Sequence, residues 1–241
     1  MREIPKLKIR RYEDFVWEKM TNISIAKDEV HLWIIRWKDM MEKILRYKYI
    51  LTREERKYAN SLRFYDDKMR SLIGRIVLKL LLSNYLKISE EQILLEKERY
   101  GKLLIKSTSK SNDIKFNLSH SGEHVSLVFV YQQKVGIDIE KIRLFSEYRE
   151  ITQRYFHPDE QKIILELKGR KGLETFYRYW TMKEAYVKAT GDGLNKDLKS
   201  FVIVEDGGMK KKVYDDGNLT NYDIYSYITD RNYIGAVAVE R

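Results

Sequence analysis

The chain has 241 residues, 43% of them hydrophobic, which is enough to build one large or two small packed domains and argues against a disordered chain. Lys and Arg total 46 against 36 Asp and Glu, and the net charge of +10 favours an anionic partner: phosphates, nucleic acid, an acidic protein or a membrane surface. The absence of cysteine excludes disulfides, thiolate zinc sites and cysteine nucleophiles.

The first residues, Met1 to Lys6, are charged and lack the apolar core of a signal peptide. The longest apolar runs, such as Ile76 to Leu82, fall far short of the roughly 18 residues that a membrane span needs. The sequence therefore predicts a soluble cytoplasmic protein without a membrane segment.

The first half of the chain combines helical and extended patterns. Thr52, followed three residues later by Glu55, predicts a capping box that opens a helix. The apolar residues between Asp66 and Tyr85 keep a 3.6-residue period, which predicts a longer helix. The other elements expected in this half are strands at 30–37, 93–98, 103–106, 116–119 and 124–131, and a helix at 38–49.

The second half repeats the order of strand, helices and strands. We expect a strand at 135–140, helical structure from about 147 to 189, and strands near Phe201, Lys212, Tyr222 and Tyr233. A repeated element order predicts two similar subdomains, 1–132 and 133–241.

The most informative segment is Val135-Gly136-Ile137-Asp138-Ile139-Glu140. Side chains alternate across a strand, so Asp138 and Glu140 lie on the same face, roughly 7 Å apart, with the apolar side chains on the other face. Two neighbouring carboxylates suit one Mg²⁺ whose remaining ligands are waters and substrate phosphates.

A second informative segment is Trp180-Thr181-Met182-Lys183-Glu184-Ala185-Tyr186-Val187-Lys188. On a helix Lys183 lies within an apolar face, and Glu184 and Lys188 flank that face. Glu184 and Lys188 could form an exposed i,i+4 ion pair. Alternatively, Glu184 turns toward the two acids as a metal ligand or base, and both lysines contact phosphate oxygens.

Two further segments could bind an anion. Phe116-Asn117-Leu118-Ser119-His120-Ser121-Gly122 places hydroxyls and an imidazole next to a bend, although Asn and Ser side chains also cap ordinary turns. Gly101-Lys102 presents a cation at the turn between two short strands.

These four segments, in the order in which they occur along the chain, resemble the motifs of the 4′-phosphopantetheinyl transferase superfamily, in its larger type with two pseudo-symmetric halves. The acidic segment and the Trp180 to Lys188 segment lie about forty residues apart, as they do in that family. The Thr52 to Gly74 segment is similar to the family's N-terminal basic region. The Gly101-Lys102 segment departs from the family pattern, because Leu103 replaces the proline that usually follows Gly-Lys.

The resemblance implies an α+β fold made of two pseudo-symmetric α/β subdomains, with coenzyme A-binding elements in the first and a metal site and catalytic helix in the second. It implies an enzyme that transfers the 4′-phosphopantetheine arm from coenzyme A to a serine of an apo acyl or peptidyl carrier protein. The reaction would need Mg²⁺ and release adenosine 3′,5′-bisphosphate. The expected partners are coenzyme A and an acidic carrier protein, and the expected state is a monomer.

The resemblance also assigns roles to residues. Asp138, Glu140 and Glu184 would hold Mg²⁺, Glu184 would act as the base for the carrier serine, and Lys188 and Lys183 would stabilise the transferred phosphate. Whether Glu184 is chiefly a ligand or chiefly the base is open. The residues expected to bind coenzyme A are Lys102, Ser119, His120, Arg70, Ser71 and Lys57, with Arg63 as an alternative in the basic region.

Two other functions compete with this interpretation. The charge and the 18 tyrosines would suit a basic nucleic-acid-binding module, although the sequence has no recognisable RNA or DNA motif. A Mg²⁺-dependent phosphodiesterase could use the same acidic pair with water as the nucleophile.

Overall fold

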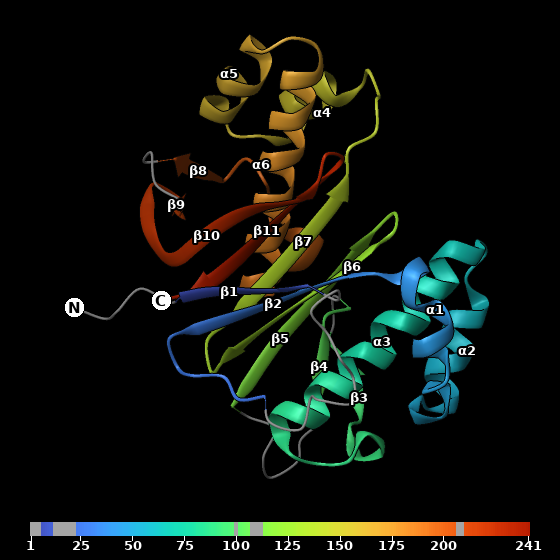
Figure 1. Cartoon of the computed structure of the whole chain (residues 1–241). Helices are drawn as coiled ribbons and strands as arrows, with labels where there is room; N and C mark the ends of the chain where they lie inside the picture. The colour runs from blue at the N-terminus through green and yellow to red at the C-terminus, as the bar shows by residue number, and fades with distance from the viewer. Residues whose placement is uncertain (1–5, 12–22, 99–100, 107–112, 206–209) are drawn as a thin grey trace. The chain divides into compact units, whose positions relative to one another are not determined.

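The computed structural model describes residues 6–11, 23–98, 101–106, 113–205 and 210–241. The chain divides into two compact units, Met1–Gln132 and Gln133–Arg241, which we call the N-terminal and C-terminal units. Each unit has its own sheet and its own long helix (Figure 1). Each also has its own hydrophobic core. The predicted α+β class is confirmed. Among the residues that the structure describes, no helix is both long and apolar enough to span a membrane.

The N-terminal unit contains a four-stranded sheet in the order β1-β2-β6-β5, in which only the β1–β2 pair is parallel. Its strands are β1 (Lys6–Arg11), β2 (Glu29–Arg36), β5 (Ile114–Ser121) and β6 (His124–Tyr131), and β3 (Leu95–Lys97) and β4 (Leu103–Ile105) form a separate hairpin. Its helices are α1 (Trp37–Leu45), α2 (Arg53–Ser61) and α3 (Tyr65–Leu86), with short 3-10 turns at Lys48–Ile50 and Glu90–Gln92.

The predicted capping box at the start of α2 is confirmed. Thr52 Oγ1 accepts a hydrogen bond from the Glu55 backbone N–H, and Glu55 Oε2 accepts one from the Thr52 N–H. The long helix α3 is buried on several faces because the sheet strands β5 and β6 contact it on one side and α1 and α2 contact it elsewhere. The predicted helix at 38–49 was too long, since α1 ends at Leu45. Strand β1 was not predicted.

The C-terminal unit contains a five-stranded antiparallel sheet in the order β7-β11-β10-β9-β8. Its strands are β7 (Val135–Lys141), β8 (Phe201–Glu205), β9 (Lys210–Asp215), β10 (Asn218–Asp230) and β11 (Tyr233–Glu240). The predicted helical stretch consists of three helices, α4 (Tyr148–Tyr155), α5 (Pro158–Glu166) and α6 (Gly169–Thr190). Pro158 opens α5, and Gly169 adopts φ +58° where α6 begins, so both breaks lie at residues suited to chain reversal.

The backbones of β7 and α6 approach each other closely at Gly136. A Cβ atom on Gly136 would lie 2.1 Å from the carbonyl oxygen of Ala185 and 2.4 Å from the amide nitrogen of Ala189. Only a residue without a side chain fits there. Because side chains alternate along a strand, the face of β7 that carries Gly136 also carries Asp138 and Glu140, and this face is turned toward α6.

We expect Gly136→Ala to lower the free energy of unfolding by about 1–3 kcal/mol or more, because the added methyl group meets backbone atoms of α6 that cannot move independently. The measurement is urea denaturation followed by circular dichroism. Gly74→Ala in α3 is the matched control: its added Cβ meets only side-chain atoms, the tip of Leu118 at 3.2 Å and Val125 Cγ1 at 3.5 Å, and alanine favours the helix by about 1 kcal/mol. Equal losses in the two variants would contradict the close approach.

Candidate functional site

Asp138 forms a buried ion pair with Lys188. Lys188 Nζ donates a hydrogen bond to Asp138 Oδ1 at 2.6 Å across the contact between β7 and α6. The Asp138 side chain is 6% exposed, whereas that of Lys188 is 31% exposed and so remains reachable from solvent. Lys188 therefore supplies the positive charge beside the carboxylate, instead of forming only a surface pair with Glu184.

Glu184 belongs to the same charged cluster. It is half-buried on α6, one turn before Lys188. Burial raises the pKa of Glu184 above its ordinary value; the charge of Lys188 opposes this shift and the charge of Asp138 adds to it. Asp138, Glu184 and Lys188 therefore act on one another, and we call these three residues the charged cluster.

Glu140 lies two residues beyond Asp138 on the same face of β7, near the outer end of the strand. The pKa of Tyr177 is raised, chiefly by burial, and the negative charge of Glu140 adds to that shift, which places Glu140 within electrostatic reach of Tyr177 on α6. The two acids of β7 thus act on residues of the same helix that are about three turns apart, Asp138 on Lys188 and Glu140 on Tyr177.

The charged cluster contains two carboxylates, and carboxylate oxygens are ligands suited to a hard divalent cation. One of these carboxylates, that of Asp138, already binds a positive charge, the Lys188 ammonium group. The geometry is less complete. In the described part of the chain, no three His, Asp or Glu side chains lie close enough together to hold a metal ion. The structure therefore brings Asp138 and Glu184 together with Lys188, and does not gather the predicted set of Asp138, Glu140 and Glu184 into one ligand group.

Lys183 lies in a different environment from the one expected for a phosphate-binding residue. Its side chain is 0% exposed and pairs with the equally buried Glu160 at 2.8 Å. Its ammonium group also donates to the carbonyl oxygens of Leu198 and Phe201, each at 2.8 Å. A lysine has three N–H donors, and these three oxygens use all of them. The structure thus places Lys183 inside the unit, away from the charged cluster, and we do not retain it as a phosphate-binding residue.

In the N-terminal unit, Arg70 contacts the hairpin that carries the Ser119-His120 motif. Arg70 Nη1 donates to the carbonyl oxygen of Gly122 at 2.7 Å, and the other end of the guanidinium group pairs with Asp67. Ser119 is buried near the end of β5 and His120 is exposed beside it. The structure therefore brings three of the predicted anion-binding residues to one end of the unit's sheet.

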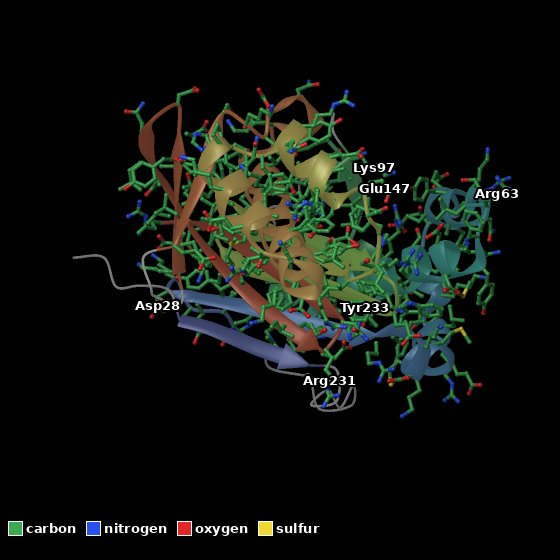
Figure 2. The ribbon with its side chains drawn as sticks, turned by 90° about the horizontal axis from the view of Figure 1, so that it is seen from above. Asp28, Arg63, Lys97, Glu147, Arg231 and Tyr233 are labelled. Carbon is green, nitrogen blue, oxygen red and sulfur yellow. The ribbon has the colours of Figure 1, made fainter. Side chains whose placement is uncertain are left out.

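The other predicted residues of this unit are more dispersed. Lys102 follows the turn of the β3–β4 hairpin, where Gly101 adopts φ +84°, whereas Tyr100 of the same motif lies outside the described residues. Ser71 is buried on α3 and accepts a hydrogen bond from Arg75 at 2.7 Å. Lys57 is exposed on α2, and Arg63 is exposed in the loop after α2 and points away from the ribbon (Figure 2).

Sequence reasoning missed Glu160, the partner of Lys183. Glu160 is the third residue of α5, and it completes a capping box in which His157 takes the place of the usual serine or threonine. The pattern of a capping residue followed three positions later by Glu was present in the sequence, and a predicted buried lysine requires such a partner.

Comparisons with known proteins cover almost all of the chain. A family model described as the 4′-phosphopantetheinyl transferase superfamily matches residues 134–238, and one described as 4′-phosphopantetheinyl transferase, N-terminal, matches residues 35–132. The 4′-phosphopantetheinyl transferase HetI of Nostoc sp. is 31% identical over 92% of both chains. The 4′-phosphopantetheinyl transferase psf-1 of Bacillus pumilus is 33% identical over 70% of this chain and 71% of its own length.

A solved structure also shows similarity to part of the chain. It is a holo-(acyl-carrier-protein) synthase from Bacillus anthracis in complex with CoA (3′,5′-ADP). It is 23% identical with a TM-score of 0.37, and the match covers 44% of this chain and 94% of the synthase.

We expect Lys188→Met to lower the free energy of unfolding by about 1–3 kcal/mol, because the buried Asp138 carboxylate loses its charged partner. Adding Asp138→Asn to this variant should recover most of the loss, since the unpaired charge is then removed. Urea denaturation of the wild type, both single variants and the double variant measures the coupling. Strictly additive effects of the two substitutions would contradict a direct ion pair.

Proposed function

The chain belongs to the 4′-phosphopantetheinyl transferase superfamily, and on that basis we propose that it transfers the 4′-phosphopantetheine arm of coenzyme A to a serine hydroxyl of an apo acyl or peptidyl carrier protein. The observation that carries the proposal is the charged cluster of Asp138, Glu184 and Lys188, which lies within the segment that the superfamily model matches. The net charge of +10 suits both an anionic substrate and an acidic carrier.

The reaction exchanges one bond to phosphorus for another. The carrier serine oxygen bonds to the phosphorus that bears the pantetheine arm, and the bond to the bridging oxygen breaks. Adenosine 3′,5′-bisphosphate leaves with that oxygen. The serine proton must be removed, and a negatively charged transition state must be stabilised, so the protein contributes mainly positioning and electrostatics.

Glu184 is suited to accept the serine proton. Burial raises the pKa of Glu184, and the negative charge of Asp138 adds to this shift while the charge of Lys188 opposes it, so its carboxylate is a stronger base than that of an exposed glutamate. Lys188 is partly exposed, so its ammonium group can contact a phosphate oxygen while its stem stays packed on α6. These two residues thus divide proton transfer and charge neutralisation between them.

Asp138, Glu140 and Glu184 are the residues that would hold Mg²⁺. The ion would neutralise the pyrophosphate of coenzyme A. The position of Asp138 on β7 opposite α6 fixes the orientation of its carboxylate. The fold would thus hold this ligand in place for the ion.

The N-terminal unit would bind the nucleotide end of coenzyme A. Arg70 lies near the end of β5 that carries Ser119 and His120, and a guanidinium group, a hydroxyl and an imidazole are each suited to phosphate, although the Ser119 and His120 side chains lie on opposite faces of the strand. Lys102 and Ser71 would add contacts, and Lys57 would add positive charge. Family membership does not favour a nucleic-acid-binding module or a phosphodiesterase, and the proposed enzyme acts as a monomer.

We expect the purified chain, incubated with coenzyme A, Mg²⁺ and a panel of apo carrier proteins, to add the mass of phosphopantetheine to at least one carrier. Intact-protein mass spectrometry makes the measurement. A carrier whose acceptor serine is replaced by alanine is the control, and a chelator should stop the reaction if Mg²⁺ is needed. Hydrolysis of coenzyme A without transfer would instead indicate a phosphodiesterase.

We expect Glu184→Gln to lower kcat by about 10²–10⁴-fold with little change in KM for coenzyme A, because the amide cannot accept the serine proton. Arg70→Met should act in the opposite way and raise KM for coenzyme A more than it lowers kcat, since it removes a phosphate contact. Steady-state kinetics on the same carrier distinguishes the two patterns. A Glu184→Gln variant with wild-type kcat would remove the base assignment.

A further inference from the structure

The Glu160–Lys183 pair joins three separate elements of the C-terminal unit. Lys183 projects from α6 and reaches the carbonyl oxygens of Leu198 and Phe201 at the start of β8. Glu160 projects from the first turn of α5, and its Oε1 accepts a hydrogen bond from the N–H of Ile203 on β8 at 2.9 Å. The same carboxylate accepts the N–H of His157, which begins α5.

This network fixes the rotation of α6 about its own axis. The Lys183 ammonium group is held by three oxygens at 2.8 Å, so it cannot turn without losing hydrogen bonds in the interior. Each residue of a helix is rotated by about 100° from the one before it. Lys183 therefore points away from β7 when Lys188, five residues later, pairs with Asp138, and Glu184 lies about 40° from Lys188 around the helix axis.

We propose that the Glu160–Lys183 pair positions the reacting side chains: it holds α6 at the rotation at which Glu184 and Lys188 lie against Asp138. This inference rests on the proposed function, since it assigns Glu160 and Lys183 a role in that reaction without contact with substrate. Both are positioning residues.

The N-terminal unit contains a second pair of the same design. Lys79 Nζ pairs with Glu55 at 2.9 Å and donates to the carbonyl oxygen of Ile50. Glu55, like Glu160, is the third residue of a helix and part of a capping box. Both lysines lie fourteen residues after the first residue of a 22-residue helix, from 65 to 79 in α3 and from 169 to 183 in α6. The pair is therefore part of the frame of both units.

Only the C-terminal unit carries the proposed reacting side chains next to its buried lysine. Counted from the buried lysine, the positions of Glu184 and Lys188 in α6 correspond to Leu80 and Asn84 in α3. The N-terminal unit thus provides the same buried pair without the adjoining carboxylate and ammonium group. It is an internal control for what the pair contributes to stability alone.

A buried ion pair is a poor source of stability, which makes its presence here informative. Removing two charges from water costs several kcal/mol per ion, and apolar side chains of similar size often stabilise the fold as well or better. What apolar side chains cannot reproduce is the set of directional hydrogen bonds from Lys183 and Glu160 to the backbone of α5 and β8. Stability and positioning can therefore be separated by substitution.

The test compares Glu160→Leu/Lys183→Met with the matched double variant Glu55→Leu/Lys79→Met. Both should lose a similar part of their stability, because each removes a capping-box glutamate and its bonds to buried backbone groups but leaves no buried charge unpaired. For the first we expect kcat to fall by about 10–100-fold with KM for coenzyme A nearly unchanged, because a displacement of the reacting groups by about 1 Å has effects of this size. For the second we expect kcat close to wild type.

Glu160→Gln/Lys183→Met is a milder variant: the amide keeps an acceptor oxygen and the side-chain shape, and no buried charge is left unpaired, so it serves if Glu160→Leu/Lys183→Met does not fold. Its kcat should fall less than that of Glu160→Leu/Lys183→Met, again without a matching rise in KM. Wild-type kcat in a folded Glu160→Leu/Lys183→Met or Glu160→Gln/Lys183→Met variant would overturn the proposal. An equal loss of kcat in the Glu55→Leu/Lys79→Met control would also overturn it, since the effect would then be one of general stability.

A measurement without substrate separates this proposal from the proposed function. Amide hydrogen exchange of residues 184–188 should be faster in Glu160→Leu/Lys183→Met than in the wild type at matched global stability. If the wild-type chain transfers nothing to any carrier, the proposed function fails, and the exchange result still decides whether the pair holds α6. Unchanged exchange in these residues would overturn the positioning role.

Discussion

The close approach of β7 and α6 is the constraint on which the rest of the C-terminal unit depends. Because Gly136 has no side chain, the helix backbone lies against the strand, and Asp138 on the same face of β7 is brought within hydrogen-bond distance of Lys188. A side chain at position 136 would meet the backbone of α6 and so separate the strand and helix that carry the two partners of this 2.6 Å ion pair. Gly136 and Asp138 thus act together: Gly136 allows the short distance between β7 and α6, and Asp138 forms its ion pair across that distance.

The charged cluster also shows how burial changes ordinary side chains. Asp138 and Glu184 are removed from water by the helix and strand that carry them, so each charge acts on the others more strongly than it would on the surface. Lys188 balances part of this negative charge while remaining partly exposed. With two carboxylates and one ammonium group, the cluster has a formal charge of −1 when all three groups are ionised, and it is accessible at the side where Lys188 is partly exposed.

The sequence predicted the parts of the molecule that repeat at short range. The period of the apolar residues indicated α3 and α6, the Thr52 to Glu55 spacing identified a capping box, and strand alternation placed Asp138 and Glu140 on one face. It could not show what lies on each side of α6, because that depends on contacts with residues far away in the chain. Lys183 was therefore expected at phosphate, although its partner Glu160 lies on another helix and its other acceptors on the segment leading into β8.

Lys183 and Lys188 together allow α6 only a small rotation about its own axis. A rotation of α6 by about 10° moves a side-chain tip roughly 6 Å from the helix axis by about 1 Å. The two lysines are held at different angles around that axis, one by the oxygens around Glu160 and the other by Asp138, and so they restrain the same rotation from two directions. A change in side-chain length at either lysine would therefore alter the hydrogen-bond distances of the other, five residues away.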